Sequence, residues 1–501
     1  MPEHHTEHSV HEVKGPFGAP VPVSEEAATL RADELNLFDS TAVAVSSVAP
    51  AYSLASTLAF VVVIGGVGLF APSVIICSFL TVLFIAVAYF HLNRKDPDCG
   101  ASYSWLSKLA SPYLGWFNGW VQVATSAIFC ISAPLLAGSY TLQFLNSIGW
   151  ISSSSAANLW LIAVVGAIWL AIITFICIYG IRWTTNVQWI LVIIEYVAVI
   201  GFSIGGIIKV ALNHPAGSRG FQFAWLNPLH VSSWSAMASG IALGVFFFWG
   251  WDTALNLNEE SKDRSRTPGR AGVISMFLLL VVFLLNFIAV QMLLTPKQIG
   301  AQGPNVLFFF GNQLFGNWAG YVMIFAVISS TVATTQTTLL PAARIAYSMS
   351  RDRVFPKLFG QIHSRYLTPA FGTLVLAFIS LFGMLLTTGS PSVNSVFAKL
   401  ILNIGVLVAF YYGITGITCG WAFRKVAFKS TKFLFTGIIL PVASGGFLLY
   451  VGYEVITTNG WGSAVWDLVV LGMGIPLVIV ARLTTKGDFF KTKTIAYDSI
   501  D

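Results

Sequence analysis

Long apolar runs separated by short polar segments dominate the chain from position 41 to position 482. A helix of about 20 residues, rising about 1.5 Å per residue, crosses the roughly 30 Å of hydrocarbon in a bilayer. The pattern therefore predicts an all-α polytopic membrane protein. Twelve transmembrane helices are expected, at residues 41–68, 71–92, 113–145, 157–179, 187–210, 233–258, 271–294, 317–349, 369–388, 392–423, 431–454 and 465–482.

The composition supports a lipid bilayer as the surroundings. Of 501 residues, 56% are hydrophobic and 10% are charged, whereas about a quarter of a soluble domain is charged. A water-soluble enzyme is therefore not expected. The net charge of +6 does not predict nucleic-acid binding, because the basic residues lie in short loops between spans and not on one face.

The cysteines give no sign of a metal site, a disulfide or a cofactor. No two of them form a C-x-x-C pair, and four fall inside apolar runs, so metal or disulfide chemistry is not predicted. The five are Cys77, Cys99, Cys130, Cys177 and Cys419.

Residues 1–36 are predicted to form a disordered cytoplasmic tail, because they contain many acids and few large apolar side chains. A short amphipathic piece is expected around Leu30, Leu35 and Leu37. No signal peptide is predicted, since the first apolar run begins near Thr41 behind this polar stretch. The tail contains four histidines, which we interpret as part of a solvated segment in preference to a metal-binding one: His4, His5, His8 and His11.

The basic residues predict the orientation in the membrane. If the N-terminus is cytoplasmic, 23 of the 27 Lys and Arg residues fall on the cytoplasmic side and three on the other, with Lys399 inside a span. Cytoplasmic loops carry an excess of Lys and Arg. The count predicts a multi-pass protein of the plasma membrane (the cell inner membrane) with both termini in the cytoplasm.

Two spans contain candidate interruptions. In the first, Pro50 removes an N–H and strains the preceding turn; in the sixth, Gly250 follows an aromatic run. Transporters with paired repeats bind their solutes where two helices unwind at mid-membrane, although isolated Pro and Gly also simply kink membrane helices. The predicted substrate-binding residues around the two positions are Ser46, Ser47, Ala49, Pro50, Ala51, Phe246, Phe248, Trp249, Gly250 and Trp251.

Three charged side chains lie within spans, where a charge costs about 2.5–3.5 kcal/mol and is usually functional. Glu195 of the fifth span has no basic neighbour in that span. It must be neutralised by a partner helix, a bound cation or a proton, or it makes a structural hydrogen bond. Asp252 follows the sixth-span interruption. Lys399 lies near the outer end of the tenth span, where it either acts in a gate or extends to the interface.

The eighth span is rich in hydroxyl groups, among them Ser330, Thr331 and Thr334. Such groups often bond to carbonyls of their own helix; here they are also candidates for a cation site opposite the first interruption. Beside the sixth-span interruption, the aromatic run containing Phe246 either faces lipid or forms an apolar lid over a small substrate. Such a ring attracts an amine by a cation–π interaction.

Four segments along residues 40–425 carry a combination of motifs. They are GVFFFWGWDTALNLNEESKDRSRTPGRA, LLPAARIAYSMSRDRVFPKLFGQIHSRYLTPA, GASYSWLSKLASPYLGWFNGW and NIGVLVAFYYGITGITCGWAFRK. Together they resemble the amino acid, polyamine and organocation (APC) superfamily of transporters, in its sixth span, eighth-span exit, third-span entry and tenth span respectively.

The resemblance implies a leucine-transporter-type core at residues 37–425, made of two inverted five-helix repeats. The repeats are expected at about 40–210 and about 233–425, followed by two further helices at 426–482 and a cytoplasmic tail at 483–501. It also implies that the substrate carboxylate meets free amides at the first-span interruption, while its amine meets carbonyls at the sixth-span interruption. By motif position, Phe246 resembles the family's aromatic gate and Asp252 its acidic residue beyond the unwound segment.

The sequence departs from the family pattern at three places. The first span has SSVAPAYS in place of the usual Gly-x-Gly, and Arg353 stands where glycine is usual. Glu195 occupies the fifth-span position where several proton-coupled relatives carry a lysine. The predicted coupling residues are Glu195, Asp252, Ser330, Thr331 and Thr334, and the predicted gate residues are Phe246 and Lys399.

The predicted function is import of a small molecule, an amino acid or related amine, by alternating access. Coupling to H+ is favoured because a single buried carboxylate can take up and release a proton; Na+ symport and amino acid or polyamine exchange are the alternatives. A channel would need a continuous polar lining, which the apolar third, sixth and tenth spans do not provide. A receptor would usually carry a sizeable soluble domain. Only Asn118, Gln122 and Ser126 are polar in the first half of the third span, which favours an α-amino acid over a polyamine.

Overall fold

The computed structural model describes residues 13–14, 20–21, 33–179, 181–390, 392–458, 461–485 and 487–499. The four histidines of the predicted tail and Leu30 therefore lie outside the described residues. Leu35 pairs with Ser261 in an isolated bridge, and Leu37 is the first residue of helix α1. Two short strands, β1 (Val13–Lys14) and β2 (Pro20–Val21), pair antiparallel.

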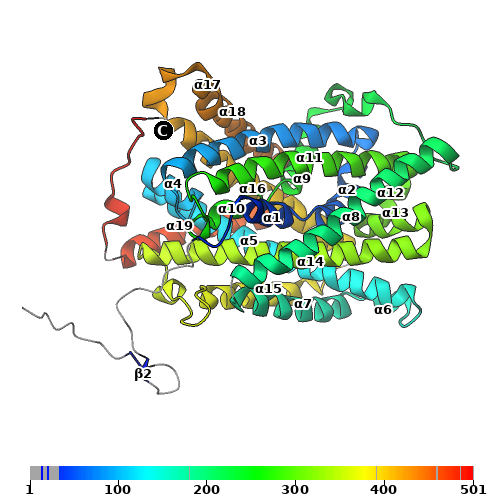
Figure 1. Ribbon diagram of the computed structural model, residues 1–501, viewed down its shortest axis with the longest axis horizontal. Helices are drawn as coiled ribbons and strands as arrows, with labels where there is room; N and C mark the ends of the chain where they lie inside the picture. The colour runs from blue at the N-terminus through cyan, green and yellow to red at the C-terminus, as the bar shows by residue number, and fades with distance from the viewer. Residues whose placement is uncertain are drawn as a thin grey trace, which may run out of the picture.

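The remainder of the described chain is a bundle of helices whose axes run largely along one direction (Figure 1). The all-α prediction is confirmed for this part. The long helices are α3 (Ala71–Lys95), α5 (Pro112–Ser147), α7 (Leu159–Tyr179), α8 (Ile181–Asn213), α11 (Thr267–Leu293), α14 (Asn317–Arg351), α15 (Ala370–Thr387), α16 (Val393–Ala422), α18 (Leu440–Thr458) and α19 (Trp461–Thr484). The shorter ones are α1 (Leu37–Val48), α2 (Pro50–Val63), α4 (Ser102–Leu109), α6 (Ser153–Ala156), α9 (Trp234–Phe247), α10 (Thr253–Asn256), α12 (Pro296–Gln302), α13 (Val306–Phe315) and α17 (Thr431–Phe433).

Eleven helical segments of the described residues are long and apolar enough to cross a membrane, with α1 and α2 together forming one of them. They coincide with eleven of the twelve predicted ranges. The exception is the predicted sixth span, 233–258, because its apolar helix α9 ends at Phe247 after 14 residues. The chain there continues through a non-helical stretch into the four-residue helix α10.

Four of the helices in the described residues lie outside the twelve predicted ranges: α4, α6, α12 and α13. Helix α4 precedes α5 at one end of the bundle, and α12 and α13 connect α11 to α14. The start of α12 carries a capping box, in which the side chains of Thr295 and Gln298 each accept a hydrogen bond from the other's main chain. These helices have 4 to 10 residues, too few to give the long apolar run on which the predictions rested.

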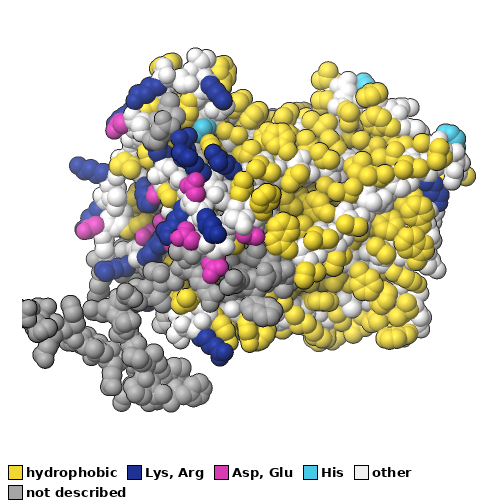
Figure 2. Space-filling view, in the orientation of Figure 1, with side chains coloured by type: hydrophobic (Ala, Val, Ile, Leu, Met, Phe, Trp, Pro, Cys, Tyr) yellow, Lys and Arg dark blue, Asp and Glu magenta, His cyan; other side chains and the backbone are white. Residues whose placement is uncertain are grey.

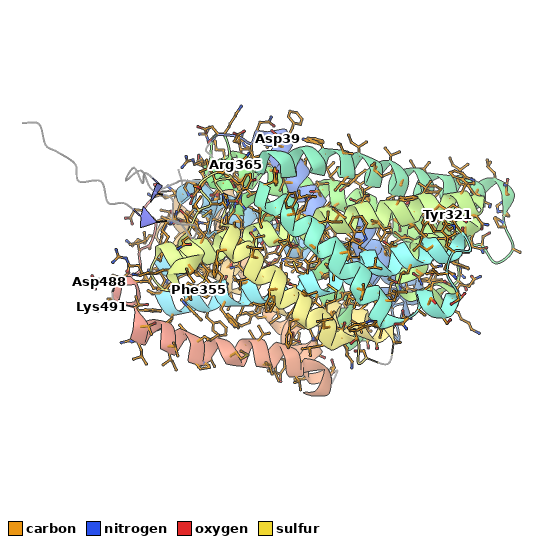
Figure 3. The ribbon with its side chains drawn as sticks, turned by 90° about the horizontal axis from the view of Figure 1, so that it is seen from below. Asp39, Tyr321, Phe355, Arg365, Asp488 and Lys491 are labelled. Carbon is orange, nitrogen blue, oxygen red and sulfur yellow. The ribbon has the colours of Figure 1, made fainter. Side chains whose placement is uncertain are left out.

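On the face shown in Figure 2, charged side chains gather at one end of the bundle, while apolar side chains cover most of the rest. We call this end the charged end, and it comprises loops 96–101, 257–266, 352–369 and 423–430 with the C-terminal segment 487–499. Arg351 joins two of these loops through Asp98 (2.9 Å) and Glu259 (3.3 Å). Tyr321 lies at the opposite end of the bundle from Asp488 and Lys491 (Figure 3).

The C-terminal segment 487–499 crosses the charged end. The N–H groups of Ile495 and Tyr497 donate to the carbonyls of Lys108 (3.0 Å) and Ala422 (2.9 Å). Phe489 stacks on Tyr103, with ring centroids 6.2 Å apart. The segment therefore connects α4 to the end of α16.

Candidate functional site

The first helix is interrupted at Ala49. Helix α1 ends at Val48 and α2 begins at Pro50, while Ala49 adopts the left-handed region at φ 50° and ψ 76°. Proline causes this locally, because it has no N–H and disfavours helical geometry in the residue before it. The predicted interruption at Pro50 is present.

The second interruption follows α9. The chain leaves the helix after Phe247, and helix α10 begins at Thr253. Gly250 between them has φ +114°, a conformation that side chains with a Cβ atom rarely adopt. The glycine permits the chain to turn out of the helix at this point.

The two interruptions touch each other. A Cβ atom on Gly250 would stand 3.0 Å from the carbonyl carbon and oxygen of Ser47, at the end of α1. The hydroxyl groups of Ser47 and Thr253 form a hydrogen bond of 2.8 Å. Two segments about 200 residues apart thus form one site in the interior of the bundle.

Glu195 of α8 caps the start of α2. Its Oε1 atom accepts hydrogen bonds from the main-chain N–H of Ala51 (2.7 Å) and from the hydroxyl of Ser330 (2.8 Å). The side chain is fully buried, and its Oε2 atom has no hydrogen-bond partner among the described residues. Nor does a Lys, Arg or His of the described chain form an ion pair with it.

The hydroxyl groups of α14, the predicted eighth span, make two kinds of contact: some bond to other helices at the first interruption, and some bond within α14. Ser330 accepts the N–H of Tyr52 (2.9 Å) in addition to its bond with Glu195. Thr334 donates to the carbonyl of Ser47 (2.5 Å). Thr331 bonds within its own helix, to the carbonyl of Val327. The structure therefore brings Ser330 and Thr334 to the first interruption, whereas the Thr331 hydroxyl is used locally.

A small cavity of about 20 Å³ lies beside the two interruptions. This is room for about one water molecule, so side chains must move before a solute of several heavy atoms can bind. The cavity is lined by Ser47, Gln122, Ser126, Trp249, Gly250, Asp252, Thr253, Asn256, Thr337, Thr338, Pro341, Ile345 and Tyr411.

An aromatic cluster packs around the aromatic residue predicted as a gate. The ring of Phe246 lies 6.2 Å from both Tyr52 and Phe129 and 6.5 Å from Trp249, centroid to centroid. The indole N–H of Trp249 donates to the hydroxyl of Tyr411. These rings join helices α2, α5, α9 and α16 and connect the gate residue to the cavity lining.

Several predicted site residues do not reach the cavity. Phe248 packs between Phe79 and Phe283, and Trp251 packs against Tyr89 and Tyr412. Side chains beyond the end of a helix do not follow the helical repeat of 3.6 residues. The sequence therefore could not show that these two rings point away from the cavity. Two more lie elsewhere: the hydroxyl of Ser46 bonds to Val43 in its own helix, and Lys399 is exposed on α16. The predicted substrate-binding residues Ala49, Pro50, Ala51 and Phe246 are also not among the residues that line the cavity.

The cavity also contains residues that the predicted site did not include. Gln122 and Ser126 were noticed as polar residues of the third span, and their spacing of four places both on one face of α5. Thr337 and Thr338 belong to the hydroxyl-rich stretch. The sequence did not identify Tyr411 as a site residue, because a tyrosine in an apolar span is usually part of the packed core.

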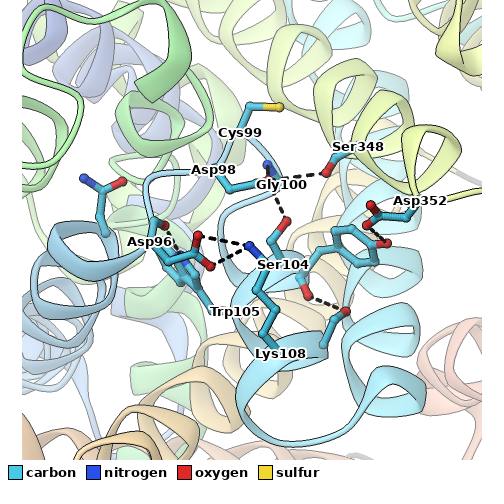
Figure 4. A network of polar contacts seen from close by, with 12 residues as sticks. Asp96, Asp98, Cys99, Gly100, Ser104, Trp105, Lys108, Ser348 and Asp352 are labelled. Atoms are coloured by element: carbon cyan, nitrogen blue, oxygen red, sulfur yellow. Dashed lines mark hydrogen bonds and ion pairs between the residues drawn. The ribbon is translucent and has the colours of Figure 1, made fainter. Parts of the chain in front are cut away.

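A polar network at the charged end contacts the C-terminal end of α14 (Figure 4). Asp98 accepts hydrogen bonds from Ser104 (2.6 Å) and Ser348 (3.4 Å), and Tyr103 donates to Asp352 (2.6 Å). Burial raises the pKa of the Asp352 carboxyl, an effect that the hydrogen bond from Tyr103 partly offsets.

Within this network, Asp98, Cys99 and Glu259 are close enough together to ligate a metal ion. Both carboxylates, however, already pair with the guanidinium of Arg351. The observed contacts favour an ion-pair cluster over a metal site at these three residues.

Comparison with known proteins identifies a family. A family model described as amino acid permease matches residues 35–480. This range covers every helix described above except the last four residues of α19.

The curated relatives are transporters with various substrates in their names. The low-affinity putrescine importer PlaP of Escherichia coli K12 is 26% identical over 381 residues, covering 74% of this chain and 78% of PlaP. The branched-chain amino acid permease BcaP of Lactococcus lactis is 26% identical over 376 residues, covering 69% and 74%. The human large neutral amino acids transporter small subunit 2 is 25% identical over 357 residues, covering 70% and 62%.

Proposed function

The chain belongs to the amino acid permease family of the APC superfamily, and from this we propose that it is a secondary active transporter importing an amino acid or related amine. The family is one of multi-pass membrane transporters and not of enzymes. Transport would proceed by alternating access and would be coupled to protons.

We propose twelve membrane crossings, counting α9 with α10 as an interrupted sixth. The core would consist of two inverted repeats at about 40–210 and about 233–425, followed by helices within 426–482. In support, the helix interrupted at Ala49 would open the first repeat and the helix interrupted at Gly250 would open the second. Equivalent interruptions in two halves are typical of transporters built from inverted repeats.

The observation that carries the proposal is the contact between the two interruptions. The Ser47 and Gly250 main chains lie against each other, and a cavity lined by five different helices begins there. A cavity with room for about one water molecule, beside the packed Phe246 cluster, is what an occluded state of a carrier requires. A channel would instead present a continuous polar lining.

Glu195 is the proposed proton carrier. A buried carboxylate without a cationic partner is costly in a membrane interior, and binding a proton removes that cost. Its Oε2 atom is free to hold the proton, while Oε1 keeps the hydrogen bonds from Ala51 and Ser330. Protonation would weaken the interaction of Glu195 with the positive end of α2 and so link proton binding to movement of that helix.

Sodium coupling remains the alternative, because Glu195 and Ser330 both offer oxygen ligands. The hydrogen bonds that Thr331 and Thr334 donate to main-chain carbonyls favour proton coupling over sodium coupling. These two hydroxyls would have to rotate away from their present acceptors to complete an oxygen shell around a cation.

The orientation is proposed from the charged end. It collects the loops that hold most of the basic residues, so it would face the cytoplasm of a cell whose plasma membrane holds the protein. Both termini would then be cytoplasmic, as the count of basic residues predicts.

The test is accumulation of radiolabelled solute by proteoliposomes under an imposed pH gradient, with a Na+ gradient in a parallel sample. Glu195→Gln is expected to abolish accumulation and to leave exchange of solute across the membrane partly intact. Thr331→Val, which changes a hydroxyl bonded only within its helix, is the matched control and should accumulate normally. Unchanged accumulation by Glu195→Gln would remove Glu195 from the coupling step, and accumulation driven by Na+ alone would select the alternative.

A further inference from the structure

The start of α2 has no main-chain N–H left for a ligand. The first N–H groups of a helix have no partner within the helix and lie at its positive end, which makes the position suited to a carboxylate. Pro50 has no N–H. The N–H groups of Ala51, Tyr52 and Ser53 donate to Glu195, to Ser330 and to the carbonyl of Ala49 respectively.

The protein's own carboxylate therefore stands where the carboxylate of an amino acid would bind. Glu195 reaches this place from α8, and the hydroxyl of Ser330 on α14 holds the same Oε1 atom at 2.8 Å. Both side chains are fully buried. The cap is thus fixed from two helices that do not belong to either interruption.

The cavity offers no cationic side chain to an anion. Among the described residues that line it, the only formal charge belongs to Asp252, and none is a lysine, arginine or histidine. Helix α10 behind Gly250 has four residues, too few to present the charge of a helix end.

The same lining suits a cation. Trp249 and Tyr411 both line the cavity, and the face of an aromatic ring attracts an ammonium group. The carboxylate of Asp252 supplies the opposite charge, and the hydroxyl oxygens of Ser47, Ser126 and Thr338 can accept hydrogen bonds from an ammonium.

We propose that the preferred substrate is a cationic amine without a carboxylate, bound with its ammonium group opposite Asp252. Glu195 supplies the negative group at α2 that an amino acid would otherwise bring with it. This assignment rests on the transport function proposed above and narrows its substrate class. It also reverses the preference for an α-amino acid that the sequence alone suggested.

The test uses pairs of compounds that differ only by a carboxylate. Ornithine and putrescine, lysine and cadaverine, and phenylalanine and phenethylamine are compared as ligands of the purified full-length protein and as solutes in proteoliposomes. In each pair that binds, the amine is expected to bind at least about tenfold more tightly, a difference of about 1.4 kcal/mol. Equal or tighter binding of the amino acid in these pairs would overturn the proposal.

Two variants test the part played by the cap. Glu195→Ala removes the carboxylate from the first turn of α2, so the ratio of amino acid to amine affinity is expected to rise at least about tenfold. Glu195→Gln removes the charge but keeps an acceptor oxygen for the N–H of Ala51, so it is expected to raise this ratio less than Glu195→Ala does. An unchanged ratio in a folded Glu195→Ala protein would contradict the assigned role. If that variant does not fold, the comparison of compound pairs in the unaltered protein decides the question alone.

The outcomes distinguish failure of the proposed substrate class from failure of the proposed transport function. Accumulation of amino acids with no response to the matching amines leaves the transport function standing and refutes the substrate class. Absence of binding and flux for every amine and amino acid tried refutes both.

Discussion

Arg344 of α14 and Glu260, beyond α10, form an ion pair that is almost completely removed from solvent. Their side chains are 0% and 1% exposed, and two hydrogen bonds of 2.9 Å join the guanidinium to the two carboxylate oxygens. The main-chain carbonyl of Glu260 also accepts the N–H groups of Glu34 and Leu35. The pair thus fixes two segments to α14: the chain after the second interruption and the residues that lead into α1.

Glu260→Gln is expected to lower the free energy of unfolding by about 3–5 kcal/mol, because Arg344 is then left buried without a counter-charge. The measurement is thermal unfolding of the purified protein in detergent. The double variant Glu260→Gln, Arg344→Met should be more stable than the single one. A double variant that is less stable than the single one would show that the arginine is held by other contacts.

Gly250→Ala is expected to reduce solute flux at least tenfold and to cost about 1–3 kcal/mol of stability. The added methyl group would require a positive φ and would stand 2.9–3.0 Å from atoms of Ser47. Gly201→Ala on α8 is the matched control, since a Cβ there meets no atom within 4 Å. Flux at the wild-type rate in Gly250→Ala would mean that the close contact with Ser47 is not needed during the cycle.

Asp352 should make stability depend on pH. Burial raises its pKa, so the folded state holds the proton more tightly than the unfolded state does. Its stabilising contribution is complete below the ordinary aspartate pKa of about 3.9 and is lost as the pH rises through the raised value. Asp352→Asn should remove this part of the slope in thermal unfolding measured across that range. The control is Asp488→Asn, at a side chain that is 89% exposed, and a slope unchanged in both variants would contradict the assignment.

The C-terminal segment should detach when its aromatic anchors are removed. Phe489 packs on Tyr103, and Phe490 packs on Tyr113 with centroids 5.0 Å apart. Changing both to alanine should speed hydrogen exchange at Ile495 and Tyr497 by about tenfold or more, since local opening becomes easier. Mass spectrometry of exchanged peptides measures this. Lys491→Ala, at an exposed ion pair, should leave the exchange rate unchanged; an equal effect in both variants would argue against aromatic anchoring.

The sequence predicts those features of the site that depend on local backbone chemistry. Pro50 and Gly250 mark the two interruptions because their effects on φ and hydrogen bonding act within a few residues. Glu195 was recognisable as a group needing a partner, because a charge in an apolar span is expensive. Eleven of the predicted spans follow from apolar length alone.

Other features depend on three-dimensional packing and were beyond the sequence. Glu195 accepts the N–H of Ala51 only because α8 and α2 cross at the level of these two residues. The direction of the rings beyond Phe247 follows from the turn of the interrupted chain, which separates Trp249 in the cavity lining from Phe248 against α3 and α11. No periodic pattern carries that information, because the helix stops there.

The left-handed conformation of Ala49 has a consequence for the energetics of binding. The main-chain groups released by this interruption are bonded by Glu195, Ser330 and Thr334, so the protein itself maintains the opened helix. A solute entering the cavity does not have to supply the free energy of unwinding. The free energy of solute binding can therefore be used to move the surrounding helices, which is the step that a carrier must drive in every turnover.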